Sequence, residues 1–199
     1  MKGLSVLLVL AVAVGFGLMG CSDTTDPIVA PADQPEAISL AKGPIVNSAS
    51  GNCGIFFDGK SLTFAFNAKK YADGSCSGEY QIYVHSQEPE WGKWHGKVVS
   101  LEVYDGNKAV IGGIETHSGF PGYYDAFVVI DNGEGGNAMP DVWTSSVYWD
   151  ESLTAAEAVW AMTPDDVVDV IVALNASFGY ILTPADVLTP IQHGNIQVK

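Results

Sequence analysis

Apolar and polar residues alternate along much of the chain from about Ser48 onward, and this period of two is typical of β-strands with one buried face. In SLTFAFNA, for example, Leu62 and Phe64 fall on one face, with small or polar residues between them. Turn residues separate such stretches, and Asp105-Gly106 is a strong hairpin signal. The alternating stretches are 61–68, 79–85, 96–115, 123–131, 141–149 and 193–199. This pattern predicts a mainly β domain, either an antiparallel β-sandwich or a small β-barrel.

The same period assigns individual side chains to faces. It places Val99, Leu101 and Val103 together on one face of their strand. It also points Ile196 and Val198 inward from the last strand.

Between about 150 and 190 the period changes to that of a helix. Val167, Val168, Ile171 and Leu174 form an apolar stripe with acidic residues opposite. Three threonines have the character of helix N-caps, namely Thr154, Thr163 and Thr183. Helices this short are marginal alone in water, so we expect this α-helical insertion, placed before the last strand, to cap one end of the β domain with Ile171 buried.

The chain begins with an apolar run behind Lys2. Residues 4–19 have the length of a signal-peptide core and fall short of the roughly 20 residues that span a bilayer. The run ends in LMGC, which resembles the lipobox of bacterial lipoproteins and implies a signal peptide at 1–20 and a lipid on Cys21. The alternatives are an ordinary secretory signal and an uncleaved anchor in which the cysteine is incidental. We expect anchoring in the cell envelope. The resemblance to enteric lipoproteins, in which a residue other than Asp after the cysteine goes with outer-membrane sorting, implies the outer membrane, because Ser22 stands there.

Residues 21–47 are rich in Pro, Asp, Ala and Thr and show no sustained period. This composition predicts a disordered linker between the lipid and the domain. The β domain with its helical insertion is then expected at 48–199.

The chain is strongly acidic, with a formal net charge of −14, and all nine of its basic residues are lysines. Loss of residues 1–20 would remove one lysine and no acid and bring the charge to −15. The planar guanidinium group of arginine is the usual bidentate ligand of phosphate in proteins. The absence of arginine therefore argues against nucleic acid, nucleotide and anionic-lipid partners. The charge as a whole should repel acidic surfaces.

Three cysteines are an odd number for an exported protein. If Cys21 carries the lipid, Cys53 and Cys76 remain as a pair in an oxidising compartment, which favours a disulfide between them. Two buried free thiols are the alternative.

One polar cluster carries candidate chemistry, the loop VHSQEPEWGKWHG. Its candidate ligand-binding residues are His85, Glu88, Trp91, Trp94 and His95. If the two histidines face each other near the base of the loop, imidazoles with a carboxylate nearby have zinc- or copper-binding chemistry. A polar hairpin with tryptophans over the core edge is the simpler interpretation, so we expect no metal and no cofactor.

Two further features allow more than one interpretation. The segment 131–141, DNGEGGNAMPD, has calcium-binding oxygens but lacks EF-hand spacing, so a tight turn is the favoured interpretation. Trp143 and Trp149, with the loop tryptophans, could stack on a sugar, although aromatic residues at alternate strand positions are more often core.

Four stretches in order resemble a family of small secreted bacterial β domains, the post-COAP-1 domains. They are LTFAFNAKKYADGSCSGEYQIYVH, HGKVVSLEVYDGNKAVIGG, GYYDAFVVIDNGEGG and GNIQV. The resemblance implies a β fold and supplies no catalytic residue, because the family has no assigned activity. The cysteine pair and the helical insertion depart from the family pattern.

No nucleophile elbow, zinc-protease motif, phosphate-binding loop or C-x-x-C pair occurs in the sequence. We therefore expect a lipid-anchored envelope or surface lipoprotein acting as a non-catalytic structural or interaction module, with an envelope protein or a small ligand as its partner. The alternative is a β-barrel that binds a small molecule or glycan through the aromatic loop around Trp91 and Trp94.

Overall fold

The chain divides into two compact units, 1–39 and 40–199, and the computed structural model describes residues of the second. The described residues are 42–57, 60–85, 92–117, 121–134, 139–144, 147–148, 152–177, 179 and 181–199. The expected signal peptide, the lipid site at Cys21 and nearly all of the expected linker lie outside these residues. The first strand begins at Ile45, ahead of the expected domain boundary at Ser48.

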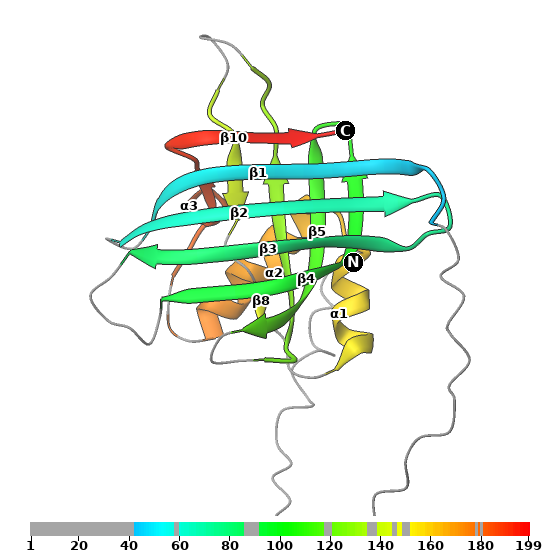
Figure 1. Cartoon of the computed structure of the whole chain (residues 1–199). Coiled ribbons are helices and arrows are strands. Elements are labelled where there is room, and N and C mark those ends of the chain that lie inside the picture. Colours follow the sequence, from blue (N-terminus) through cyan, green and yellow to red (C-terminus); the bar gives the residue numbers. More distant parts are fainter. Residues whose placement is uncertain are drawn as a thin grey trace, which may run out of the picture. The chain divides into compact units, whose positions relative to one another are not determined.

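The domain is mainly β, as the alternating pattern predicts (Figure 1). Its strands are β1 (Ile45–Phe57), β2 (Lys60–Tyr71), β3 (Cys76–His85), β4 (Lys93–Tyr104), β5 (Lys108–His117), β6 (Tyr124–Ile130), β7 (Val142–Thr144), β8 (Val147–Tyr148), β9 (Leu188–Pro190) and β10 (His193–Val198). They form one antiparallel sheet in the order β10-β1-β2-β3-β4-β5-β6-β7-β9, with β8 paired to β6. The sheet is curled into a half-barrel rather than built as two separate layers.

The curl encloses a core between the two halves of the sheet, with β1–β3 crossing in front of β5 and β6 in Figure 1. We call the side of the sheet that faces this core the inner face. Buried residues of the core are Ala49, Cys53, Ile55, Leu62, Phe64, Phe66, Ala68, Tyr80, Ile82, Val84, Val98, Leu101, Ala109, Ile111, Phe127, Val129, Trp143, Ile191, Ile196 and Val198. The predicted inward orientation of Ile196 and Val198 is confirmed.

One predicted face is wrong because β4 contains an irregularity. The pairing of β4 with β5 shifts register between Val98 and Ser100, as a β-bulge does. Val98 and Leu101 therefore point to the inner core, whereas Val99 packs on the opposite side. A bulge adds one residue to a strand, and strict alternation cannot reveal it.

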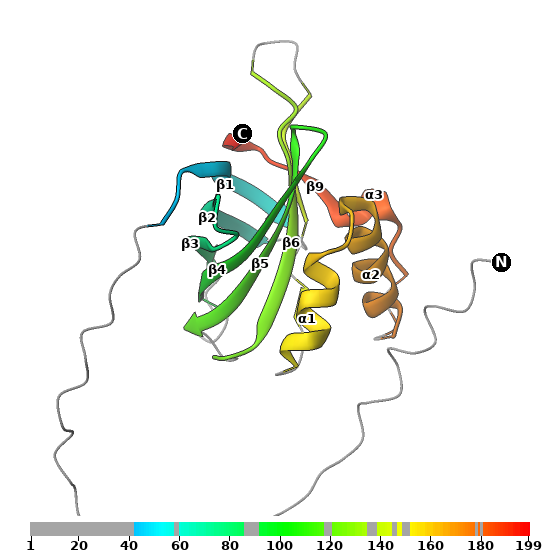
Figure 2. The same ribbon diagram turned by 90° about the vertical axis from the view of Figure 1, so that its right-hand side faces the viewer.

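The helices cover the outer face of β5 and β6 instead of capping an end of the sheet, which corrects the sequence-based expectation (Figure 2). They are α1 (Leu153–Trp160), α2 (Pro164–Ser177) and α3 (Pro184–Val187), and two strands follow them rather than one. Val167, Val168 and Ile171 of the predicted stripe are buried in a second core with Val110 and Val128. Both faces of β5 and β6 are therefore covered.

Two of the three predicted helix caps are confirmed. Thr163 accepts a hydrogen bond from the Asp166 N–H, and Thr183 forms a capping box with Asp186. The third is wrong, because α1 begins after Ser152, whose side chain accepts from the Ala155 N–H.

Candidate functional site

The structure does not bring the two histidines of the predicted ligand cluster together. His85 Nε2 lies 2.9 Å from Thr63 Oγ1 on β2. His95 Nδ1 lies 2.9 Å from Thr116 Oγ1 on β5, and its Nε2 lies 3.4 Å from Glu79 Oε2. Two other members of the cluster, Glu88 and Trp91, lie outside the described residues.

Of the tryptophans that could stack on a sugar, the two that the structure describes, Trp94 and Trp143, lie on the core side of the sheet. Trp94 pairs with Ile82 and packs, half-buried, against the inner core. Trp143 is buried, with its ring centroid 5.2 Å from that of Phe64. Trp149 is outside the described residues, so the structure shows no sugar-stacking platform among the residues it describes.

The outer face of β2, β3 and the first half of β4 is uncovered, in contrast to that of β5 and β6. Its outward side chains, which we call the open face, are Ser61, Thr63, Ala65, Asn67, Lys69, Ser77, Glu79, Gln81, Tyr83, His85, Lys93, His95 and Lys97. They alternate with the buried residues Phe64, Phe66, Tyr80 and Ile82. Strand periodicity thus places a polar surface directly over the aromatic core.

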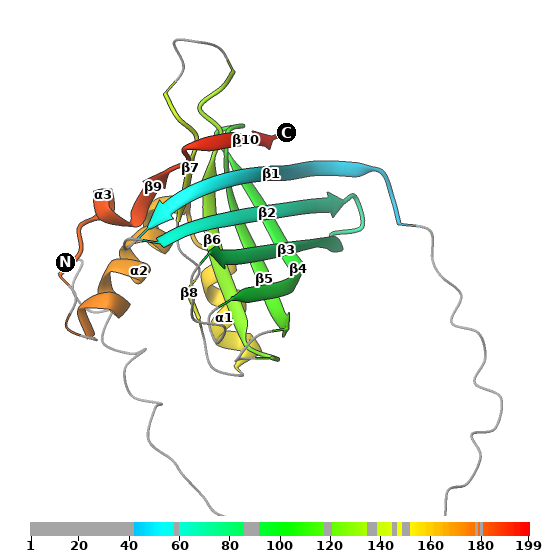
Figure 3. The same ribbon diagram turned by 60° about the vertical axis from the view of Figure 1, so that its left-hand side comes forward.

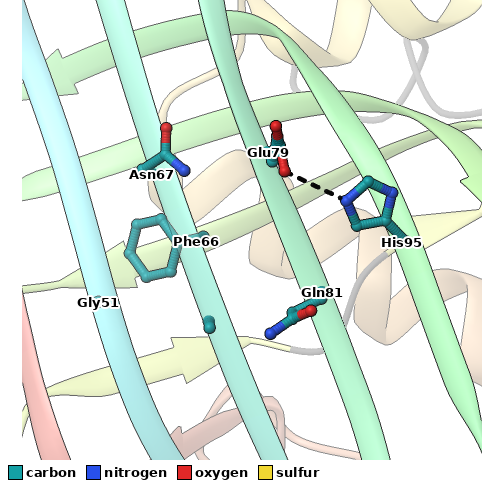
Figure 4. A pocket seen from close by; sticks show the side chains of 7 residues that line it. Gly51, Phe66, Asn67, Glu79, Gln81 and His95 are labelled. Carbon is teal, nitrogen blue, oxygen red and sulfur yellow. Dashed lines mark hydrogen bonds and ion pairs between the residues drawn. The ribbon is translucent and has the colours of Figure 1, made fainter.

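Two shallow grooves mark the open face and share Gln81 and His95. One, of about 220 Å³, is lined by Ala65, Asn67 and Glu79 as well. Figure 4 shows the labelled amide, carboxylate and imidazole groups of this groove and the contact between Glu79 and His95. The other groove, of about 300 Å³, includes Tyr83, Lys93 and Trp94. Sequence reasoning named His95 and Trp94 but missed the amides, which only strand register places beside them.

A second polar cluster is buried in the inner core, where it combines Tyr80, Glu115 and Asp125 from three strands. The Tyr80 hydroxyl donates to Asp125 Oδ2 at 2.6 Å and lies 3.4 Å from Glu115 Oε1. Burial raises the pKa of Asp125 to about 8, the Glu115 charge adds to the shift, and the Tyr80 hydrogen bond opposes it. Trp160 of α1 donates to the Asp125 backbone oxygen at 2.8 Å, which ties the helical layer to this strand.

Two glycines make room for this cluster. Gly96 and Gly113 face the Tyr80 ring from β4 and β5, and a Cβ at either position would overlap the ring. At Gly113 it would also meet the buried Asp125 Oδ1. The cluster is closed off from solvent, so it is a structural proton-binding group rather than a substrate site.

Two acids at the ends of the segment 131–141, Asp131 and Asp141, hold the edge of the sheet. Ile196 and Val198 of β10 turn their N–H groups away from β1, and Figure 3 shows β10 beside the ends of β6 and β7. Asp141 Oδ2 accepts from the Ile196 N–H at 2.7 Å, and Asp131 Oδ2 accepts from the Val198 N–H at 3.1 Å. These carboxylates thus accept hydrogen bonds from backbone N–H groups that an edge strand would otherwise leave unpaired. Their engagement supports the interpretation of this segment as a turn rather than as a calcium site.

Replacing Asp141 with alanine should lower the free energy of unfolding by about 2–3 kcal/mol, because two backbone donors lose their acceptor. Those donors are the N–H groups of Asn132 and Ile196. Amide hydrogen exchange at Ile196 should accelerate. The exposed Glu134 accepts only side-chain donors from β10, so Glu134→Gln is the control and should leave that amide protected. An unchanged exchange rate at Ile196 in Asp141→Ala would mean that the Asp141 carboxylate does not hold this backbone N–H.

The expected disulfide is wrong, because Cys53 and Cys76 are free thiols. Cys53 pairs with Phe64 of β2, whereas Cys76 pairs with Lys70 of the same strand. The six positions between those partners correspond to roughly 20 Å along the strand, far beyond the reach of a disulfide. An even count of cysteines in an exported chain gives no information on this distance.

We expect both thiols to stay reduced in the folded protein, with different reactivity. Burial, together with the charge of Asp141, raises the pKa of Cys53 to about 12, and its Sγ lies 3.5 Å from the Phe64 carbonyl oxygen. Cys76 is half-buried, and burial raises its pKa as well. Alkylation of the Cys21→Ser protein, followed by mass spectrometry, should modify Cys76 first and Cys53 only on unfolding. A mass that shifts on reduction would contradict this result.

The described residues contain no group of three or more His, Cys, Asp or Glu side chains that could hold a metal ion. Of the helices that the structure describes, none has the length and apolar character needed to cross a membrane.

In comparisons with known proteins, no family model, no curated protein and no solved structure matches the chain.

Proposed function

We propose that this protein is a lipid-anchored envelope lipoprotein whose β domain is a non-catalytic structural or interaction module. The observation that carries the proposal is the filled interior of the curled sheet. Four aromatic side chains, those of Phe64, Phe66, Phe127 and Trp143, are each at most 5% exposed there. A partner must then engage the outside of the domain.

The packing of these rings explains why the interior is full. The Phe64 ring centroid lies 5.2 Å from that of Phe66 and 5.1 Å from that of Phe127, in stacked and edge-to-face arrangements. The ring of Tyr80 adds a further contact at 5.5 Å from Phe127. Rings at these distances are in direct contact, which argues against the small-molecule barrel.

Thermal unfolding with benzene in solution tests this part of the proposal. A ligand that binds only the folded state raises the midpoint of unfolding. We expect no shift for the full-length protein, whereas Phe64→Ala should leave an apolar cavity that benzene fills, so that the midpoint of this variant rises. A midpoint that rises equally in both proteins would favour the ligand-binding barrel instead.

Labelling with palmitate tests the anchor, which rests on the LMGC motif alone. The unaltered protein should incorporate the label and be cut before Cys21, and Cys21→Ser should lose both. Ser22→Ala, next to the site, is a matched control that should remain labelled. An unlabelled protein, or cleavage elsewhere, would contradict lipid anchoring.

The resemblance to the post-COAP-1 domains is likewise a proposal. It is supported by the position of the four motif stretches, which form β2 with β3, β4 with β5, β6 with its following turn, and β10. These strands belong to one sheet.

A further inference from the structure

The open face carries positive charge on an otherwise acidic protein. Lys69, Lys93 and Lys97 project from it, and Glu79 is its only acidic side chain. The helical layer, by contrast, exposes Asp165, Asp166 and Asp169 of α2. Local charge rather than net charge governs what approaches a surface, so the repulsion expected from the net charge of −14 does not extend to this face.

The open face also presents polar groups in a regular grid. Asn67 lies directly across from Glu79, and Gln81 lies directly across from His95. Neighbouring strands are about 4.8 Å apart, so each pair can reach one small polar ligand group. Ala65 lies opposite Gln81 and leaves a hollow between these longer side chains. Amides offer donors and acceptors together, as a sugar bearing several hydroxyl groups requires.

We propose that the open face binds an acidic polysaccharide of the kind built from sugars with carboxylate groups. The lysine ammonium groups pair with the carboxylates, while Asn67 and Gln81 hydrogen-bond to hydroxyls over the hollow at Ala65. This inference rests on the proposed function as a non-catalytic module of the envelope and names the class of its partner.

Two observations favour an acidic polysaccharide over other occupants. The Lys93 ammonium lies 5.4 Å from the centroid of the Tyr83 ring, so the most exposed aromatic ring of this face is already engaged and does not serve as a base-stacking platform for nucleic acid. Three lysines of the face, Lys69, Lys93 and Lys97, stand against its single acid, Glu79, so the face keeps an excess of two positive charges over its carboxylate. The open face is therefore a shallow surface with amide groups that can hydrogen-bond to hydroxyls and with an excess of positive charge.

Binding of fluorescent alginate oligosaccharides to the full-length protein, in a nonionic polyoxyethylene detergent, tests the inference. Dextran is the neutral comparison. We expect saturable alginate binding that weakens as salt rises, because ions screen these contacts. The double variant Lys93→Gln/Lys97→Gln should bind about tenfold or more weakly. The control Lys108→Gln, whose lysine pairs with Asp105 away from the open face, should bind normally.

A variant that binds alginate more tightly shows that the loss of binding in the lysine variant is not caused by misfolding. Glu79→Gln removes the one acid of the face and should tighten alginate binding, which misfolding does not do. Equal binding of dextran, an equal loss in Lys108→Gln, or no alginate binding would each overturn the inference. So would self-association that the double lysine variant abolishes, since a second copy would then occupy the face. None of these outcomes alters the palmitate or benzene results, which test the proposed function separately.

Discussion

Replacing Asp125 with asparagine should abolish much of the pH dependence of this protein's stability between about pH 4 and pH 8. The Asp125 carboxyl is fully buried, and burial raises its pKa from 3.8 to about 8. Asparagine retains an oxygen that can accept the Tyr80 hydroxyl, the contact that measures 2.6 Å in the unaltered protein. The variant thus removes the ionisation and keeps the shape.

The direction follows from proton binding in the two states. Between the unfolded pKa of 3.8 and the folded pKa of about 8, the folded protein holds a proton at Asp125 that the unfolded chain has released. Stability from this group is therefore fully present below about pH 4 and is lost as pH rises through the folded pKa. At 1.36 kcal/mol per pKa unit, the loss amounts to at most roughly 6 kcal/mol.

Urea unfolding across this pH range measures the effect as the difference between the two proteins. The unaltered protein should lose free energy of unfolding relative to Asp125→Asn as pH rises, and the gap should level off above about pH 8. Asp169→Asn, an exposed acid on α2, is the control and should follow the unaltered protein. Parallel curves for the unaltered protein and Asp125→Asn would mean that the carboxyl is ionised in the folded state.

Strict alternation predicted those strands that bury one face only. β2 and β3 have every second residue buried, and the sequence shows this directly. β5 and β6 are different, because their buried residues run almost continuously, as in AVIGG and DAFVV. Such runs indicate burial on both faces, and they are the signal that could have placed the helices on the outer side of the sheet.

β1 could not be read from the sequence, although it lies between β10 and β2 within the sheet. Its centre contains Gly51 and Gly54, which favour turns when only local sequence is considered. Gly51 is required because the Phe66 ring of β2 occupies the space that a Cβ would take. A contact between two strands therefore requires glycine at position 51, and the local sequence pattern does not show this contact.

The candidate sites show the same division between local and long-range information. Alternation does place Asp125 on the same face as Phe127 and Val129, so a buried acid was readable from the sequence. The partners of His95 could not be predicted from the sequence, because they depend on the register of three strands. Loop proximity suggested His85 instead, whereas β-pairing places Glu79 and Thr116 beside His95.

Replacing Ile171 with aspartate should lower the free energy of unfolding by about 4 kcal/mol, since it buries an unpaired charge between α2 and the sheet. Ile171 is 2% exposed and packs in the second core with Val110 and Val128 of β5 and β6. The carboxylate would face apolar side chains there. The cost should appear as a lower midpoint in thermal or urea unfolding.

Ala173→Asp provides the matched control, because it adds the same charge to the same helix at an exposed position. Its effect should stay within about 1 kcal/mol, the cost of exchanging a strong helix former for a weaker one. A further readout is the indole of Trp160, which donates to the Asp125 backbone oxygen and shares the second core with Ile171. Loss of α2 packing should therefore increase hydrogen exchange at that indole before global unfolding. If Ile171→Asp behaves like Ala173→Asp, the apolar stripe of α2 does not face the sheet in solution and is free to contact another protein.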